Sequence, residues 1–123
     1  MILVVDDDAQ VRATISRALT ELGYAVSEAG DGAKALELVR DDRVDLVILD
    51  YVMPGMDGAE VARELSAIDP DLPVIFSTGH SALRALRTAA GDDVAVLHKP
   101  FTLDELDELL RDRLLERRRA KSL

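Results

Sequence analysis

Short runs of Val, Ile and Leu alternate along the chain with segments whose apolar residues recur every three or four positions. The apolar runs cover residues 2–5, 44–49, 74–76 and 94–97, and the second of them is interrupted by Asp45. Runs of this length and composition are typical of strands buried on both faces. A further strand is predicted over residues 24–27, after Gly23, which suits the end of a helix.

The segments between these strands have the spacing of amphipathic helices. In the first, one helical face gathers Val11, Ile15, Ala18, Leu19 and Leu22. Each segment begins near a possible helix cap, and these caps are Asp8, Asp31 or Gly32, Asp57, Ser81 and Thr102. Gly91 suits the end of the fourth helix. The last helix is predicted over about residues 102–118, with a short basic tail over 117–123.

Strand and helix therefore alternate along the whole chain. Strict alternation with short connections predicts a doubly wound parallel sheet, covered by helices on both faces and joined by right-handed crossovers. A chain of 123 residues is long enough to bury one core and too short for two. We therefore expect residues 1–123 to form one α/β domain.

Composition and charge exclude several classes of function. The chain has 24 acidic and 15 basic residues, and its net charge of −9 argues against direct binding to nucleic acid. The absence of cysteine excludes disulfides and thiolate metal sites. No apolar run approaches the roughly 20 residues of a membrane span, and no secretory leader precedes the first strand. We expect a cytoplasmic protein without membrane insertion.

Basic residues gather near the C-terminus, where a helix presents the negative end of its dipole. These residues are Arg111, Arg113, Arg117, Arg118, Arg119 and Lys121. Cations are commonly enriched at such positions. We therefore interpret them as a solvated helix end and not as a binding patch.

Reactive side chains follow four of the five predicted strands. Asp6 and Asp7 follow the first, Asp50 the third, Thr78 the fourth and Lys99 the fifth. In open parallel α/β sheets, ligands bind outside the carboxyl ends of the strands. We therefore expect these five side chains to meet in one site.

Three carboxylates in one site repel one another unless a cation is present. Oxygen ligands without cysteine favour a hard ion such as Mg²⁺. Lys99 and Thr78 offer a positive charge and a hydroxyl donor for phosphoryl oxygens. Together these groups suit transfer of a phosphoryl group to an aspartate, here Asp50.

The sequence resembles the receiver domain of two-component response regulators over essentially its whole length. Four motifs carry the resemblance: ILVVDDD at residues 2–8, LVILDYVMPGMDG at 46–58, STG at 77–79 and KPF at 99–101. The resemblance implies a flavodoxin-like (βα)5 fold with strand order 2-1-3-4-5. It also implies a cis bond between Lys99 and Pro100.

The resemblance assigns a role to each site residue. Asp50 accepts a phosphoryl group from the phosphohistidine of a histidine kinase or phosphotransfer protein. Mg²⁺ is held by Asp6, Asp7, Asp50 and the backbone carbonyl of Val52. Thr78 and Lys99 contact the phosphoryl group and change the surface formed by the fourth helix, fifth strand and fifth helix. The domain is then no enzyme, since it catalyses only its own phosphorylation and dephosphorylation.

Three features depart from the family pattern. Val96 stands where an aromatic switch residue is frequent. The stretch from Thr78 to Lys99 is about one residue short, which predicts a brief, irregular or mobile fourth helix. Val52 and His80 flank the phosphoryl position. Because Val52 cannot hydrogen-bond a water molecule and His80 can, we predict slow to intermediate autodephosphorylation that depends on His80.

Two other functions remain open from the sequence. One is a degenerate receiver that acts as an interaction module without phosphate, and the other is an aspartate-nucleophile phosphatase, although Val52 occupies the usual position of its acid. A flavin-binding domain is disfavoured by the acids that follow the first strand. A receiver, free-standing or part of a larger protein, would act through a downstream partner or adjoining domain and could form a weak homodimer.

Overall fold

The computed structural model describes residues 1–122, apart from the side chains of Met56, His80, Lys121 and Ser122. Its main sheet consists of β1 (Ile2–Val5), β2 (Val26–Ala29), β3 (Leu46–Asp50), β6 (Val74–Thr78) and β7 (Ala95–His98). All neighbouring strands are parallel, in the order β2-β1-β3-β6-β7. Since β6 and β7 are the fourth and fifth strands of this sheet, the predicted order 2-1-3-4-5 is confirmed.

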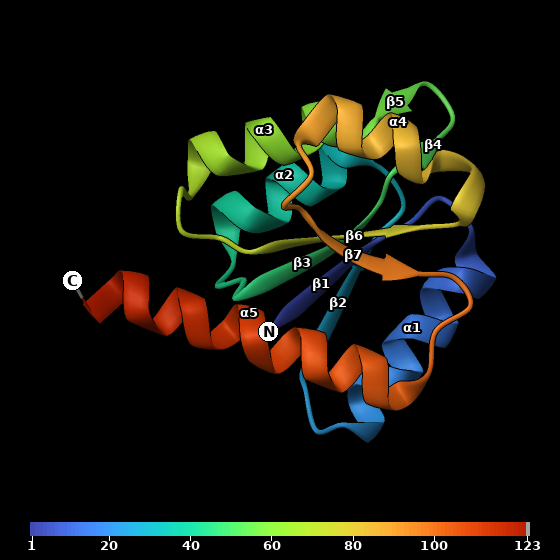
Figure 1. The fold of residues 1–123 in the computed structure, drawn as a ribbon. Coiled ribbons are helices and arrows are strands. Elements are labelled where there is room, and N and C mark those ends of the chain that lie inside the picture. The colour runs from blue at the N-terminus through green and yellow to red at the C-terminus, as the bar shows by residue number, and fades with distance from the viewer. Residues whose placement is uncertain (123) are drawn as a thin grey trace.

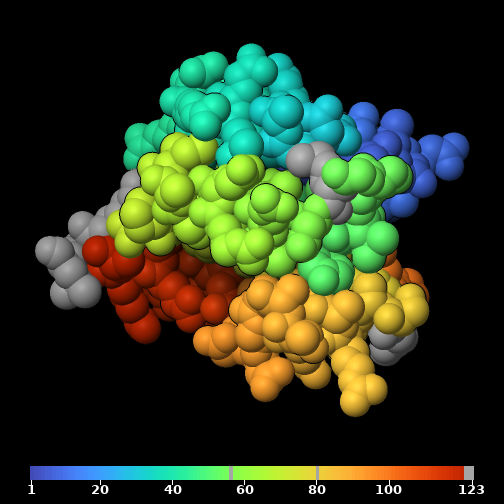
Figure 2. All heavy atoms as spheres, turned by 90° about the horizontal axis from the view of Figure 1, so that it is seen from above, coloured from blue at the N-terminus to red at the C-terminus, as the bar shows by residue number. Residues whose placement is uncertain are grey.

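Five helices cover the two faces of the sheet (Figure 1). They are α1 (Ala9–Glu21), α2 (Gly32–Asp41), α3 (Gly58–Ile68), α4 (His80–Ala90) and α5 (Leu103–Ser122). Helices α1 and α5 cover one face, and α2, α3 and α4 lie side by side on the other, as Figure 2 shows from that side. No helix among residues 1–122 is both long and apolar enough to cross a membrane.

Alternate residues of each strand face opposite layers, as the pleat of a strand requires. In β1, Leu3 and Val5 belong to the core under α2, α3 and α4, whereas Ile2 and Val4 belong to the core under α1 and α5. All four are almost fully buried. The unbroken apolar runs of the sequence therefore correspond to strands covered on both sides.

The second strand begins later than predicted. Gly23 adopts a positive φ of 96°, and its amide donates to the carbonyl of Thr20. The amide of Tyr24 donates to Leu19, which ends α1 and leaves Tyr24 outside the sheet. Strand β2 therefore starts at Val26 and continues to Ala29.

A small hairpin that the sequence pattern did not predict follows the third strand. It pairs β4 (Val52–Met53) with β5 (Met56–Asp57) in antiparallel fashion. Gly55 provides the positive φ of 70° in its turn. This hairpin places Val52 directly beside the end of β3.

Most predicted helix caps are confirmed. The side chains of Asp8, Asp31 and Asp57 accept hydrogen bonds from backbone amides in the first turns of α1, α2 and α3. The Ser81 cap is wrong, because α4 begins at His80 with Gly79 as its N-cap. Helix α4 has 11 residues, as many as α3, so the expectation of a brief helix is also wrong.

The last helix is longer than predicted. Thr102 Oγ1 accepts from the amide of Glu105 at the start of α5, as expected of a helix cap. The helix then continues to Ser122, so residues 117–122 of the predicted tail are helical, and Leu123 lies outside the described residues. Arg117 is not solvated: it is 7% exposed, and its guanidinium donates to Asp69 Oδ2 and the carbonyl of Val44. Arg117 is therefore a buried partner in an ion pair and not part of a solvated helix end, which corrects the interpretation of the basic cluster at that residue.

Candidate phosphoacceptor and metal site

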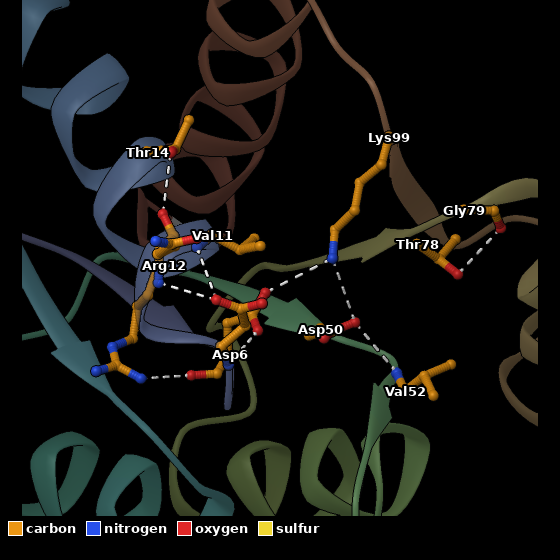
Figure 3. A network of polar contacts seen from close by, with 11 residues as sticks. Asp6, Val11, Arg12, Thr14, Asp50, Val52, Thr78, Gly79 and Lys99 are labelled. Atoms are coloured by element: carbon orange, nitrogen blue, oxygen red, sulfur yellow. Dashed lines mark hydrogen bonds and ion pairs between the residues drawn. The ribbon is translucent and has the colours of Figure 1, made fainter.

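Three carboxylates meet at the carboxyl ends of β1 and β3, and Figure 3 shows two of them, Asp6 and Asp50, beside Lys99. Asp6 and Asp7 follow β1, and Asp50 is the last residue of β3. The two strands pair with Val5 opposite Leu49, which brings the residues that follow to the same edge. One carboxylate oxygen from each of Asp6, Asp7 and Asp50 lies within 4.8 Å of the others. The predicted acidic cluster is therefore present.

Asp6 is fixed in the buried part of this cluster. The residue is 1% exposed, and its Oδ1 accepts from the amide of Asp8 at 2.9 Å. Its Oδ2 is buried and accepts no hydrogen bond from the described residues. The Lys99 ammonium group lies 3.6 Å from Oδ2. A buried carboxylate oxygen without a hydrogen bond is unfavourable, so Asp6 favours binding of a cation.

Asp50 combines burial with a nearby positive charge. It is 8% exposed, and its Oδ1 accepts from the amide of Val52 at 3.2 Å and lies 3.7 Å from Lys99 Nζ. Burial raises the pKa of Asp50 to about 6; Lys99 opposes this shift, and Asp6 adds to it by charge repulsion. Without a bound cation, a fraction of the protein therefore holds a proton on Asp50 near neutral pH.

Lys99 and Thr78 extend the site from the ends of β7 and β6. The amide of Lys99 donates to the carbonyl of Thr78 at 2.9 Å, which fixes the two chain segments together. The Lys99–Pro100 bond is cis, as the family resemblance implies. The hydroxyl of Thr78 donates to the carbonyl of Gly79 at 3.3 Å. The structure thus brings all five predicted side chains to one edge of the sheet.

The donor set of this site fits a hard divalent cation. Carboxylate oxygens are the ligands that Mg²⁺ prefers, and Asp6, Asp7 and Asp50 place three of them together. Among the described residues, the ammonium group of Lys99 lies within ion-pair distance of Asp6 and Asp50. One positive charge cannot balance three carboxylates. The cluster could therefore hold a metal ion, while Val52 as a carbonyl ligand stays a prediction.

Sequence reasoning missed three residues that shape this edge. Arg12 donates to the carbonyl of Asp6 and is paired with Glu28. Gly58 packs so closely on the backbone of Asp50 and Tyr51 that a Cβ there would lie 2.9 Å from Tyr51 Cα. Gly58 is the last residue of the motif at residues 46–58, so its close packing could have been predicted from the sequence. The pairing of Arg12 with Glu28 joins separate elements and leaves no local signal.

Val96 and His80 are two residues near the site that depart from the family pattern or vary within it. Val96 is half-buried, lies opposite Phe76 in the sheet and packs against the core under α2, α3 and α4. The side chain of His80 lies outside the described residues. Its effect on phosphoryl lifetime therefore stays a prediction.

Comparisons with known proteins agree with this geometry. The family model described as "Response regulator receiver domain" matches residues 2–111. Response regulator MprA of Mycolicibacterium vanbaalenii is 46% identical over 119 residues, which are 95% of this chain and 50% of that protein. The chain thus spans about half the length of the curated relatives it matches.

Solved structures show the same fold. The receiver domain of NtrX from Brucella abortus has a TM-score of 0.85 and 30% identity, covering 93% of this chain and 98% of that one. A CheY-like receiver domain protein from Methanospirillum hungatei has a TM-score of 0.84 and 27% identity, covering 97% and 96%. With the flavodoxin-like sheet and the four motifs in place, the chain belongs to the response regulator receiver domains of two-component signalling.

Proposed function

We propose that Asp50 accepts a phosphoryl group from the phosphohistidine of a histidine kinase or phosphotransfer protein. In this step the P–N bond of the phosphohistidine breaks, a P–O bond forms to a carboxylate oxygen of Asp50, and the released imidazole nitrogen takes a proton. The observation that supports this best is the position of Asp50. Its carboxylate ends a buried strand between two other acids and the ammonium group of Lys99.

Mg²⁺ would be held by Asp6, Asp7, Asp50 and the backbone carbonyl of Val52. The ion would offset negative charge on the carboxylates and on the phosphoryl oxygens. The buried Oδ2 of Asp6, which lacks a hydrogen bond from the described residues, supports this assignment. So does the raised pKa of Asp50, since a carboxyl disfavoured as an anion gains from a nearby cation.

Lys99 and Thr78 would hold the transferred group. The Lys99 ammonium would move from the carboxylate pair toward a phosphoryl oxygen, where it makes a charge-assisted hydrogen bond. The Thr78 hydroxyl would exchange the carbonyl of Gly79 for a second phosphoryl oxygen. Since Gly79 is the N-cap of α4, this exchange links Asp50 to the surface formed by α4, β7 and α5.

That surface would be read by a downstream protein or by an adjoining domain. Val96 stands where an aromatic switch residue is frequent in the family, and valine has no ring to rotate. The conformational change after phosphorylation would therefore pass through Thr78 and the start of α4. Contact with nucleic acid by this domain is not expected from its net charge of −9. We place the domain in the cytoplasm, where its phosphodonor would meet it.

Labelling with acetyl phosphate tests the proposal without knowledge of the kinase. The protein is incubated with acetyl phosphate with or without Mg²⁺, and its intact mass is measured. We expect a gain of one phosphoryl group that requires Mg²⁺ and is lost in Asp50→Asn. Asp57→Asn is a matched control, because Asn also caps a helix and Asp57 lies outside the acidic cluster. Equal labelling of Asp50→Asn and the native protein would contradict the proposal.

The same assay separates the two alternatives. A degenerate receiver would gain no phosphoryl group in the presence of Mg²⁺. A phosphatase would hydrolyse a generic phosphate ester such as p-nitrophenyl phosphate with multiple turnovers. We expect labelling and no such turnover, because no carboxylic acid stands two residues beyond Asp50 to protonate a leaving group.

A further inference from the structure

Arg12 connects the acidic loop to the neighbouring strand. Its Nη1 donates to the backbone carbonyl of Asp6 at 2.8 Å, as Figure 3 shows, and its Nε donates to Glu28 Oε1 at 3.1 Å. Arg12 lies in the first turns of α1, and Glu28 lies in β2. The Arg12 side chain is 22% exposed, so its hydrogen bonds are partly shielded from water. One guanidinium group thus joins three chain segments.

The backbone of Asp6 is held from both sides. Its amide donates to the carbonyl of Ala29 at 3.1 Å, and its carbonyl accepts from Arg12. That carbonyl belongs to the peptide group between Asp6 and Asp7. The Arg12 hydrogen bond therefore fixes the peptide plane from which the Asp7 backbone starts. Because ordering a flexible backbone on binding costs free energy, a loop that is already ordered binds a ligand more tightly.

Arg12 contacts the backbone of Asp6, and no described hydrogen bond or ion pair joins its guanidinium to a carboxylate of the acidic cluster. Lys99 differs, since its ammonium lies near the carboxylates of both Asp6 and Asp50. Arg12 can therefore order the loop without competing for the oxygens that a metal ion would use. The two cations have separate functions in this site.

We infer that Arg12, held by Glu28, is a positioning residue that presents Asp6 and Asp7 to Mg²⁺. This inference rests on the metal site proposed above. It predicts that loss of Arg12 changes the Mg²⁺ affinity in the direction opposite to that expected from charge alone. A cation beside a cation site repels the ion, so removal of Arg12 would tighten Mg²⁺ binding if only its charge mattered. Loss of a positioning residue weakens binding instead.

The test is Mg²⁺ titration of the metal-free protein by isothermal calorimetry. For Arg12→Gln we expect Mg²⁺ affinity to fall about tenfold, as is typical when a partner behind metal ligands is removed. The Mg²⁺ affinity of Arg12→Lys should lie between those of the native protein and Arg12→Gln. A lysine ammonium group lacks the planar fork with which the guanidinium contacts Asp6 and Glu28 together. Arg111→Gln is the control, since Arg111 pairs with Asp107 on the exposed surface of α5. Tighter or unchanged binding by Arg12→Gln would overturn the inference.

A second readout requires no metal ion. Amide hydrogen exchange should become faster at Asp6 and Asp8 in Arg12→Gln, while amides in β6 keep their protection. Unchanged exchange at Asp6 and Asp8 would also overturn the inference. If the proposed metal site itself is wrong, the result is distinguishable, because the native protein would then bind Mg²⁺ no better than Asp50→Asn does.

Discussion

The ammonium nitrogen of Lys99 lies 3.7 Å from Oδ1 of Asp50, at the buried edge where β3 and β7 end. This pair lowers the pKa of Asp50, while burial raises it to about 6. We predict that Lys99→Met raises the pKa further in the metal-free protein, because the opposing charge is lost. The measurement is an NMR titration of the Asp50 carboxyl carbon. Lys34→Met, which removes an exposed lysine of α2, should leave that pKa unchanged. A lower pKa in Lys99→Met would contradict the electrostatic account.

The raised pKa of Asp50 also makes the stability of the protein depend on pH. This pKa is raised from 3.8 to about 6 in the folded protein, so the contribution of Asp50 to stability is fully present below about pH 4 and is lost as pH rises through 6. One pKa unit corresponds to about 1.4 kcal/mol, so the loss is on the order of 1–3 kcal/mol. Asp50→Asn should therefore be more stable than the native metal-free protein at pH 7. Urea unfolding at pH 7 and pH 4 measures the difference.

Mg²⁺ should restore the stability that the native protein loses when Asp50 ionises. A bound cation stabilises the ionised form of Asp50, so added Mg²⁺ should raise the free energy of unfolding at pH 7. The same addition should have little effect on Asp50→Asn, which lacks one of the three carboxylates. Equal stabilisation of both proteins would place the binding of Mg²⁺ elsewhere.

Gly58 supports the segment that carries the acceptor. A Cβ at this position would lie 2.9 Å from Tyr51 Cα and 3.1 Å from the carbonyl oxygen of Asp50. We predict that Gly58→Ala lowers the free energy of unfolding by about 1–3 kcal/mol, because backbone must move to make room. At Gly79, a Cβ would meet nothing within 4 Å. Gly79→Ala should therefore cost less than about 1 kcal/mol, as expected for an exchange at a helix N-cap. Equal losses measured by urea unfolding would contradict this packing argument.

Arg117 ties the last turns of α5 to the loops that precede β3 and follow α3. Its guanidinium lies 2.9 Å from Asp69 Oδ2 and reaches the carbonyl of Val44. Arg117→Ala would leave the partly exposed Asp69 carboxylate without this cation, so we predict a loss of about 1.5–3 kcal/mol in stability. Arg111→Ala removes an exposed ion pair with Asp107 and should cost less than about 1 kcal/mol. Thermal unfolding compares the two variants, and similar melting temperatures would show that the Arg117 pair does not stabilise the fold.

The sequence pattern predicted the sheet and the grouping of the acidic side chains with Lys99 because both depend on local signals. Buried parallel strands are continuous apolar runs, and their ends carry the reactive residues, so Asp50 and Lys99 could be placed without a structure. The helix caps Asp8 and Asp57 were equally readable, since a cap bonds to amides two or three residues away.

The errors arose where one interaction outweighed a local preference. Tyr24 suits a strand, but its amide ends α1 instead. The β4 and β5 strands have two residues each, too few to show alternation. Arg117 was placed in solvent by its charge, whereas its partner Asp69 lies far away in sequence. Pairs of this kind, like Arg12 with Glu28, are set by the packing of separate elements.

Chemical mapping of the labelled residue shows which side chain accepts the phosphoryl group, for which we propose Asp50. The protein is labelled with acetyl phosphate and Mg²⁺, and the acyl phosphate is reduced with borohydride, which converts a phosphorylated aspartate to homoserine. Peptide mass spectrometry then locates the homoserine. We expect homoserine at position 50 only. Homoserine at position 6, 7 or 57 with an unchanged Asp50 would contradict it.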